Sequence, residues 1–356
     1  MSRSATNPWL NRFAILTALA TLALIGIGGL VTSHGVGMAV PDWPTTYGYN
    51  MFAFPISKWV GGVFYEHSHR LVASAVGFLT VILMVWLWIK DSRRWLRWLG
   101  VAAFFAVVLQ GVLGGLRVVL YKDEIGIFHA ALAQAFLVLT CAIALFTSAW
   151  WNKLSERIAP IIDNAGLRRL FAIVTVLIFV QLVVGATMRH QHAGLAIPDF
   201  PLAYHKIWPP MDAASVATYN QTRDAAEGTN PITAFQIGLQ MLHRIMALLI
   251  GIAVVYSAWL TRRQLGVRNP LAKLSLVWVG LILLQVTLGA YTIWSNKAAD
   301  IATVHVMVGA LSLVTATLLT IVSFRLLIPV RAANLAAAKS ETTEFLPDKR
   351  AATSVK

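Results

Sequence analysis

Four histidines stand near the starts of long apolar runs, where they could bind a metal-centred cofactor. They are His69, His129, His243 and His305. Ionisable side chains are costly inside a bilayer and mark functional sites there. Imidazoles that face each other across a helix bundle can hold a six-coordinate heme. A single histidine is more often an ordinary polar contact, so the prediction of two bis-histidine heme sites, His69 with His129 and His243 with His305, depends on the four together.

A carboxylate distinguishes the first of these pairs. Glu66 precedes His69 by three residues and lies on the same helix face, one turn nearer the helix start. The equivalent residue of the second pair is Gln240. A carboxylate at a reacting centre can accept a proton, orient water or stabilise positive charge. We therefore expect chemistry at the first site and a fixed heme at the second. The alternative is a hydrated interfacial acid paired with Arg70 or Lys58.

Three arginines are candidates for binding heme propionates. Arg70 and Arg244 directly follow His69 and His243, and Arg117 lies near the end of the third apolar run. A guanidinium offers two parallel donors to a carboxylate. Arg117 could alternatively pair with the Glu66 carboxylate. For all three, the alternative interpretation is an arginine whose stem is buried and whose charged head reaches the membrane surface.

The composition identifies the setting as a membrane. The chain has 356 residues, of which 58% are hydrophobic and 12% charged, and its mean hydropathy is +0.68. A soluble domain carries about twice that share of charge. Apolar runs of about 20 residues or more can cross a bilayer as helices. Eight such runs are expected to span it: residues 13–33, 66–89, 98–120, 126–151, 169–188, 235–260, 272–294 and 301–328.

The charge pattern orients these spans. Twenty of the 29 Lys and Arg residues lie at the N-terminus, in three short connectors and in the C-terminal tail. Positive connectors stay on the cytoplasmic side, so both termini are expected inside and the histidines near the outer face. The net charge of +14 then reflects orientation and attraction to anionic lipid, and no nucleic-acid partner is expected.

The two halves of the chain repeat each other. "GVGMAVPDWPTTY" corresponds to "HAGLAIPDFPLAY", "EHSHRLVA" to "QMLHRIMA", "LQGVLGGLR" to "LQVTLGAYT", and "FHAALAQAFL" to "VHVMVGALSL". An even number of spans per copy gives both copies the same orientation, related by an axis along the membrane normal. The predicted fold is an all-α membrane protein with eight transmembrane helices in two tandem, pseudo-twofold-related four-helix bundles. The expected parts are a first bundle at 1–151, a cytoplasmic linker at 152–168, a second bundle at 169–328 and a disordered cytoplasmic tail at 329–356.

On these features the sequence resembles the heme A synthase family, whose members oxidise a methyl group of heme O to the formyl group of heme A for cytochrome oxidase. The resemblance rests on the eight spans in two related halves, the Glu66-x-x-His69 element, the three later histidines and the Pro-Asp-aromatic-Pro stretches at 41–44 and 198–201. It covers the chain from about Arg12 to Ile328. Family members with a cysteine pair in an outer loop differ from this chain, whose one cysteine is Cys141 in an apolar run, and a thiol-based electron exit is therefore in doubt.

The resemblance implies a role for each residue. Glu66 would be the catalytic acid, His69 and His129 the ligands of the substrate heme O, and His243 and His305 the ligands of a resident heme b. The reaction would be two successive hydroxylations and a dehydration, with oxygen from water. Implied partners are heme O synthase, cytochrome oxidase assembly factors and an electron acceptor that the sequence does not identify, and a second copy of the chain is a further candidate. The implied location is the bacterial inner membrane, with the hemes toward the periplasm.

A different function fits part of the same pattern. A membrane cytochrome with two b hemes that only transfers electrons would use the same four histidines, although it would not require the Glu66 carboxylate. A transporter built from parallel repeats would explain the duplication but not the histidines. Among the remaining histidines, His67 is expected close to a loop or at the interface, and His190 and His192 are expected to be solvated loop residues, with a metal site at "RHQH" as the alternative.

Overall fold

The computed structural model describes residues 7–154, 161–162, 165–227 and 231–328. Eight of its helices are long and apolar enough to cross a membrane. The expected fold class, an all-α protein with eight spanning helices, is thus confirmed. The long helices are α1 (Pro8–Ser33), α2 (Gly61–Lys90), α3 (Arg94–Val119), α4 (Ile125–Thr147), α7 (Ala165–His190), α9 (Ala234–Leu265), α10 (Pro270–Trp294) and α11 (Ala299–Leu326).

Shorter elements complete the described chain. They are the 3₁₀ turns η1 (Met51–Ala53) and η2 (Ile56–Lys58), the helices α5 (Ala149–Asn152) and α8 (Ala213–Glu227), and the two-residue strands β1 (Ile161–Ile162) and β2 (Leu327–Ile328), which pair in parallel. The helix α8 lies within the second long loop. The expected linker, 152–168, lies partly outside the described residues, and the expected tail, 329–356, wholly outside.

Local signals in the sequence explain several helix starts. The Asn7 side chain accepts from the N–H groups of Trp9 and Leu10, and Asn269 caps α10 in the same way from just before a proline. These are standard arrangements for satisfying the first N–H groups of a helix. Several boundaries differ from expectation by four or five residues; α1 and α2, for example, each begin five residues earlier than expected. The fourth span ends at Thr147 because Ser148 adopts an extended conformation and caps α5, and the fifth begins at residue 165 rather than 169.

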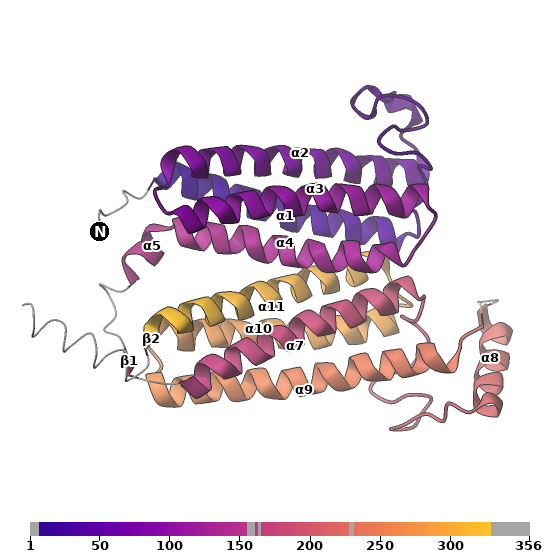
Figure 1. Ribbon diagram of the computed structural model, residues 1–356. Helices are drawn as coiled ribbons and strands as arrows, with labels where there is room; N and C mark the ends of the chain where they lie inside the picture. Colours follow the sequence, from indigo (N-terminus) through magenta and orange to yellow (C-terminus); the bar gives the residue numbers. More distant parts are fainter. Residues whose placement is uncertain (1–6, 155–160, 163–164, 228–230, 329–356) are drawn as a thin grey trace, which may run out of the picture.

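The eight spans pack in two rings of four (Figure 1). In the first ring, α1 contacts α2, α2 contacts α3, α3 contacts α4 and α4 closes on α1; in the second, α7, α9, α10 and α11 contact one another in the same cyclic order. The rings meet through α1 with α11, α4 with α7, and α4 with α11. When the two halves are exchanged, the α1–α11 contact becomes the α7–α4 contact and the α4–α11 contact maps onto itself. This is expected for a pseudo-twofold axis that passes between α4 and α11.

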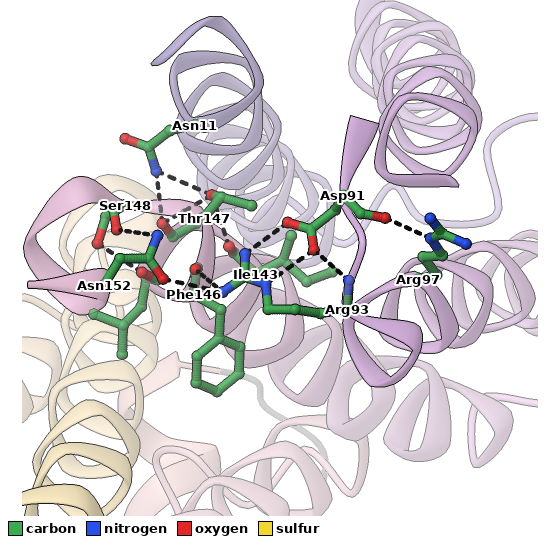
Figure 2. A network of polar contacts seen from close by, with 11 residues as sticks. Asn11, Asp91, Arg93, Arg97, Ile143, Phe146, Thr147, Ser148 and Asn152 are labelled. Carbon is green, nitrogen blue, oxygen red and sulfur yellow. Dashed lines mark hydrogen bonds and ion pairs between the residues drawn. The ribbon is translucent and has the colours of Figure 1, made fainter. Parts of the chain in front are cut away.

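A polar network holds the first ring together at the end opposite to the long loops (Figure 2). In the α2–α3 turn, Arg93 donates to both carboxylate oxygens of Asp91, at 2.9 and 2.6 Å. Its remaining nitrogen reaches the Phe146 carbonyl of α4 at 3.0 Å and the Asn152 side chain of α5 at 3.2 Å. Burial opposes ionisation of Asp91, but its bonds to Arg93 outweigh burial and hold the pKa of this carboxyl below its ordinary value.

The second ring has the larger buried apolar core, and Trp278 at its centre is fully buried against Phe171 of α7. We expect Trp278→Ala to lower the free energy of unfolding by about 3 kcal/mol or more, because it leaves a cavity among packed helices. Trp259→Ala is the matched control, since Trp259 is 51% exposed on the outside of α9. Titration with SDS in mixed micelles measures both. Equal losses in the two variants would show that this core does not hold the ring together.

Candidate functional site

The two Pro-Asp-aromatic-Pro stretches fold into the same loop. In the first loop (residues 34–60), Asp42 accepts from the N–H groups of Tyr47 at 2.7 Å and Gly48 at 2.8 Å. In the second loop (residues 191–233), Asp199 accepts from Tyr204 at 2.7 Å and from the next N–H at 2.8 Å. The aspartate of each motif therefore organises its loop, a role that its recurrence in both halves could have indicated from the sequence.

In each half, the helix that follows the loop binds the loop backbone through two side chains. One side chain accepts a hydrogen bond and the other donates. Glu66 of α2 accepts from the Val40 N–H at 2.8 Å, and at the equivalent place Gln240 of α9 accepts from the Ile197 N–H at 2.6 Å. Both side chains are buried. The loops therefore attach to the helices by the same bond, through a carboxylate in one half and an amide in the other.

The arginines next to the histidines donate to the same loops. The guanidinium of Arg70 donates to the carbonyls of Val40, Asp42 and Thr45 at 2.6 to 3.0 Å, and to Glu66 at 2.6 Å. Arg244 donates to two carbonyls of the second loop, those of Leu202 at 2.8 Å and Asp199 at 2.7 Å. Both terminal nitrogens of each guanidinium are thus occupied by backbone. The role of these arginines in binding propionates stays a prediction, and it would require them to exchange these bonds.

Each of the four histidines lies against a glycine of the neighbouring helix. A Cβ on Gly28 would stand 3.0 Å from the His69 ring, and one on Gly114 would stand 3.2 Å from the His129 ring. The second ring repeats this arrangement, with Gly185 against His243 at 3.3 Å and Gly289 against His305 at 3.2 Å. A side chain at any of these glycines would crowd the imidazole, so the glycines leave the space that the histidine rings occupy.

The histidines of each pair stand on opposite helices of one ring. His69 of α2 faces His129 of α4 across the first ring, and His243 of α9 faces His305 of α11 across the second. Within each pair the rings are close enough to interact electrostatically. The structure thus brings together the pairs that the sequence suggested, each near the loop end of its ring.

The nitrogens of these four rings lack most of the partners that buried imidazoles normally have. All four Nδ1 atoms are buried without a hydrogen-bond partner. Among the described residues, the His305 Nε2 has Gln285 at 3.3 Å. Gln181, by contrast, donates to the His243 carbonyl at 2.9 Å and not to an imidazole. Half-buried rings with free nitrogens are suited to coordinate a metal.

Two histidines differ from expectation. His67 is fully buried rather than interfacial, with its Nδ1 3.2 Å from the Thr46 hydroxyl and its ring packed on Phe54 and Trp59. Its equivalent in the second half is apolar, Met241. The difference arises because the first loop folds back over the start of α2, which single-helix reasoning could not foresee.

His190, expected in a solvated loop, is instead the buried last residue of α7. Its Nδ1 lies 3.4 Å from Asp123 of the α3–α4 turn, in the other half. Arg117 donates to the same carboxylate at 2.6 Å, and so pairs with Asp123 rather than with Glu66. His192 is 80% exposed, as expected, and 3.9 Å from Asp123. Among the described residues, these side chains form no cluster that could hold a metal ion.

Fold and site together define a class: a polytopic membrane protein built from two related four-helix rings, each with an imidazole pair beneath an outer loop. The comparison with known families is more specific. The family model for cytochrome oxidase assembly proteins, COX15-CtaA, matches residues 11–318. The chain therefore belongs to this family.

Similar proteins of known name point the same way. The chain is 30% identical to a heme A synthase of Shouchella clausii over 253 residues, which are 69% of this chain and 74% of that one. It is 25% identical to the heme A synthase of Halalkalibacterium halodurans over 304 residues, covering 84% and 92% of the two chains. It is 27% identical to that of Geobacillus kaustophilus over 306 residues, covering 83% and 86%.

The loop scaffold can be tested through Asp42. Burial opposes ionisation of this carboxyl, but the bonds from Gly48, Thr45 and Tyr47 outweigh burial, and its pKa lies below the ordinary 3.8. We expect Asp42→Asn to loosen the first loop, because an amide presents one acceptor oxygen where the carboxylate has two. The measurement is the rate of proteolytic cleavage within residues 47–60, with Asp300→Asn at an exposed site as control.

The same carboxylate sets a pH dependence. Because the pKa is lowered in the folded state, Asp42 contributes its full stabilisation above pH 3.8 and loses it as the pH falls through the lower folded value. Cleavage of the wild-type loop should accelerate over that acid range and should be independent of pH above it. A variant loop that is cleaved as slowly as the wild type would contradict this role.

Proposed function

We propose that the protein is a heme A synthase: it takes heme O as substrate and oxidises its methyl substituent to a formyl group by two hydroxylations and a dehydration. The observation that carries this proposal is the asymmetry between two otherwise matching sites. Both halves have an imidazole pair and a loop held by the same hydrogen bond, and only the first half makes that bond through a carboxylate, Glu66.

The residues present fit a heme in each ring. The four glycines leave room for the Cε1–Nδ1 side of each ring, so axial ligation would use the Nε2 atoms, and among the described residues the His305 Nε2 alone has a hydrogen-bond partner. His69 and His129 would hold the substrate heme O, and His243 and His305 a resident heme b. When bound, the resident heme would provide a route for electrons that leave the substrate. At His305, iron would replace the contact with Gln285.

The environment of Glu66 suggests how this residue acts. Its two oxygens receive bonds from the Val40 N–H and from Arg70, at 2.8 and 2.6 Å, so both oxygens are held in fixed positions. Conversion of a methyl group and water to a formyl group releases four protons and four electrons. An anion fixed one helical turn from His69 can stabilise positive charge on the substrate and orient the attacking water. The pairing with Arg70 matches the alternative given above, but Glu66 is buried, at 4% exposed, rather than at the interface.

The domain roles and orientation follow from this proposal. The first bundle, 1–151, would carry out the chemistry and the second, 169–328, would hold heme b. The protein is a multi-pass bacterial membrane protein. Both termini would lie in the cytoplasm and the loops and hemes toward the periplasm, consistent with the N-terminus and the long loops at opposite ends of the rings (Figure 1). Heme O synthase, assembly factors of cytochrome oxidase and an electron acceptor would be its partners.

Incubation with heme O tests the function, because an enzyme of this kind yields hydroxylated heme and then heme A, which extraction and mass spectrometry detect. A cytochrome that only transfers electrons would return heme O unchanged. We expect Glu66→Gln to lower the conversion rate about 100-fold or more while both hemes stay bound. The amide should preserve the bond to the Val40 N–H, as Gln240 does in the second half.

Glu124→Gln is the control for this variant, since Glu124 is an exposed acid at the same end of the rings. Glu66→Ala should lose conversion and also loosen the first loop, which separates the chemical role of the side chain from its structural one. Near-normal turnover in the Gln variant would remove the catalytic assignment.

The ligand assignment has a separate test. We expect His243→Ala to lose the absorbance of the resident low-spin heme, because one axial imidazole is gone, while His205→Ala, at an exposed loop position, keeps it. The readout is the reduced-minus-oxidised spectrum of purified protein made without heme O. An unchanged spectrum in His243→Ala would refute the assignment.

A further inference from the structure

Basic side chains gather where the two rings meet at their loop ends. Arg117 comes from the last turn of α3, Arg189 from the end of α7 and Lys297 from the turn between α10 and α11. These three residues, here called the interface cluster, belong to both halves of the chain. No role assigned above accounts for Arg189 or Lys297.

Arg189 joins the halves directly. Its Nη2 donates to the Gly29 carbonyl of α1 at 2.6 Å and to the Ser33 hydroxyl, and Gly29 itself packs against Thr303 of α11. The guanidinium thus lies at the contact between the rings. Its Nε is buried without a hydrogen-bond partner, so part of its donor capacity is unused.

Arg117 and Lys297 occupy matching places in the two halves. A Cβ on Gly37 would meet Arg117 at 2.8 Å, and one on Gly194 would lie 3.9 Å from the Lys297 stem. Gly37 and Gly194 are equivalent in the repeated stretches that open the two loops. Burial lowers the pKa of Lys297, and the charge of Arg189 lowers it further, which indicates that the two cations are close.

The cluster carries more positive charge than its surroundings neutralise. Among the described residues, Asp123 is the one carboxylate in an ion pair with it, through Arg117 at 2.6 Å. Partly buried charge without counter-charge is unfavourable, and an anion in reach would be bound. The cluster also lies close to the imidazole pairs, because Arg117 follows Gly114, which packs on His129, by three residues, and Arg189 follows Gly185, which packs on His243, by four.

We propose that Arg117, Arg189 and Lys297 form a carboxylate-binding site shared by the two halves, which takes propionate groups of the porphyrins held by the two histidine pairs. Arg117 serves the first ring and Lys297 the second, and Arg189 stands between them. This inference rests on the proposed function, because it requires a porphyrin in each ring. It assigns propionate binding to residues that differ from Arg70 and Arg244, whose terminal nitrogens are already occupied by loop carbonyls.

The test compares iron protoporphyrin IX with its dimethyl ester, which has the same ring but no carboxylates. Full-length protein produced under heme limitation is titrated with each, and binding is followed by the absorbance of the bis-imidazole complex. We expect the wild type to prefer the free acid, and Arg189→Gln and Lys297→Gln each to reduce that preference about tenfold. Lys206→Gln, an exposed lysine of the second loop, should leave the preference unchanged.

The ratio of the two affinities separates the possible outcomes. A variant that folds poorly would bind acid and ester equally less well and leave the ratio intact, so a fall in the ratio reports the loss of a charge contact. Equal binding of acid and ester by the wild type, or a ratio that neither variant changes, would overturn the inference and leave the proposed function standing. If neither porphyrin bound, the proposed function itself would fail.

Discussion

The interior of a bilayer offers no water, so each polar group placed there must find its partner within the protein or in a ligand. The rest of this structure depends on that constraint. Glu66 and Arg70 meet it through the backbone of the first loop, and the α2–α3 turn meets it through the Asp91–Arg93 network. The four histidines do not meet it fully within the protein, because their Nδ1 atoms are buried and unpartnered and, among the described residues, the His305 Nε2 alone has a hydrogen bond. An iron porphyrin would engage these rings, which is why they point to a heme protein.

Duplication lets one half serve as an internal reference for the other. Loop geometry, the helix-to-loop bond and the glycine beside each imidazole recur in both halves. Where the halves diverge, the difference is chemical: Glu66 against Gln240, and the His67–Thr46 contact against an apolar pair, Met241 and Ala203. Since the scaffolds match, these substitutions are the basis for the proposal that the chemistry takes place in the first ring.

The hydrogen bonds of the arginines clarify their roles. Sequence proximity to a histidine suggested that Arg70 and Arg244 bind propionates, yet both hold loop carbonyls. Arg189, whose Nε has no hydrogen-bond partner, and Lys297 come from segments that lie far apart in the sequence. They come near one another because α11 packs against α1 and α7 against α4 at the contact between the rings, which brings Arg189 at the end of α7 to Gly29 of α1. The role of a charged side chain in a membrane protein therefore depends on its tertiary contacts as well as on its depth in the bilayer.

The sequence by itself determined the membrane class, the eight spans and the repeat, and it predicted the pairing of the histidines. These follow from hydropathy, helical period and local order, which are properties of a segment and its near neighbours. Tertiary structure alone decided that His67 and His190 are buried, that Arg117 pairs with Asp123, and that Arg189 crosses to the other half. Those outcomes depend on how a loop folds over a helix end and how one ring lies against the other. Such contacts join residues far apart along the chain, and no local pattern of residue types encodes them.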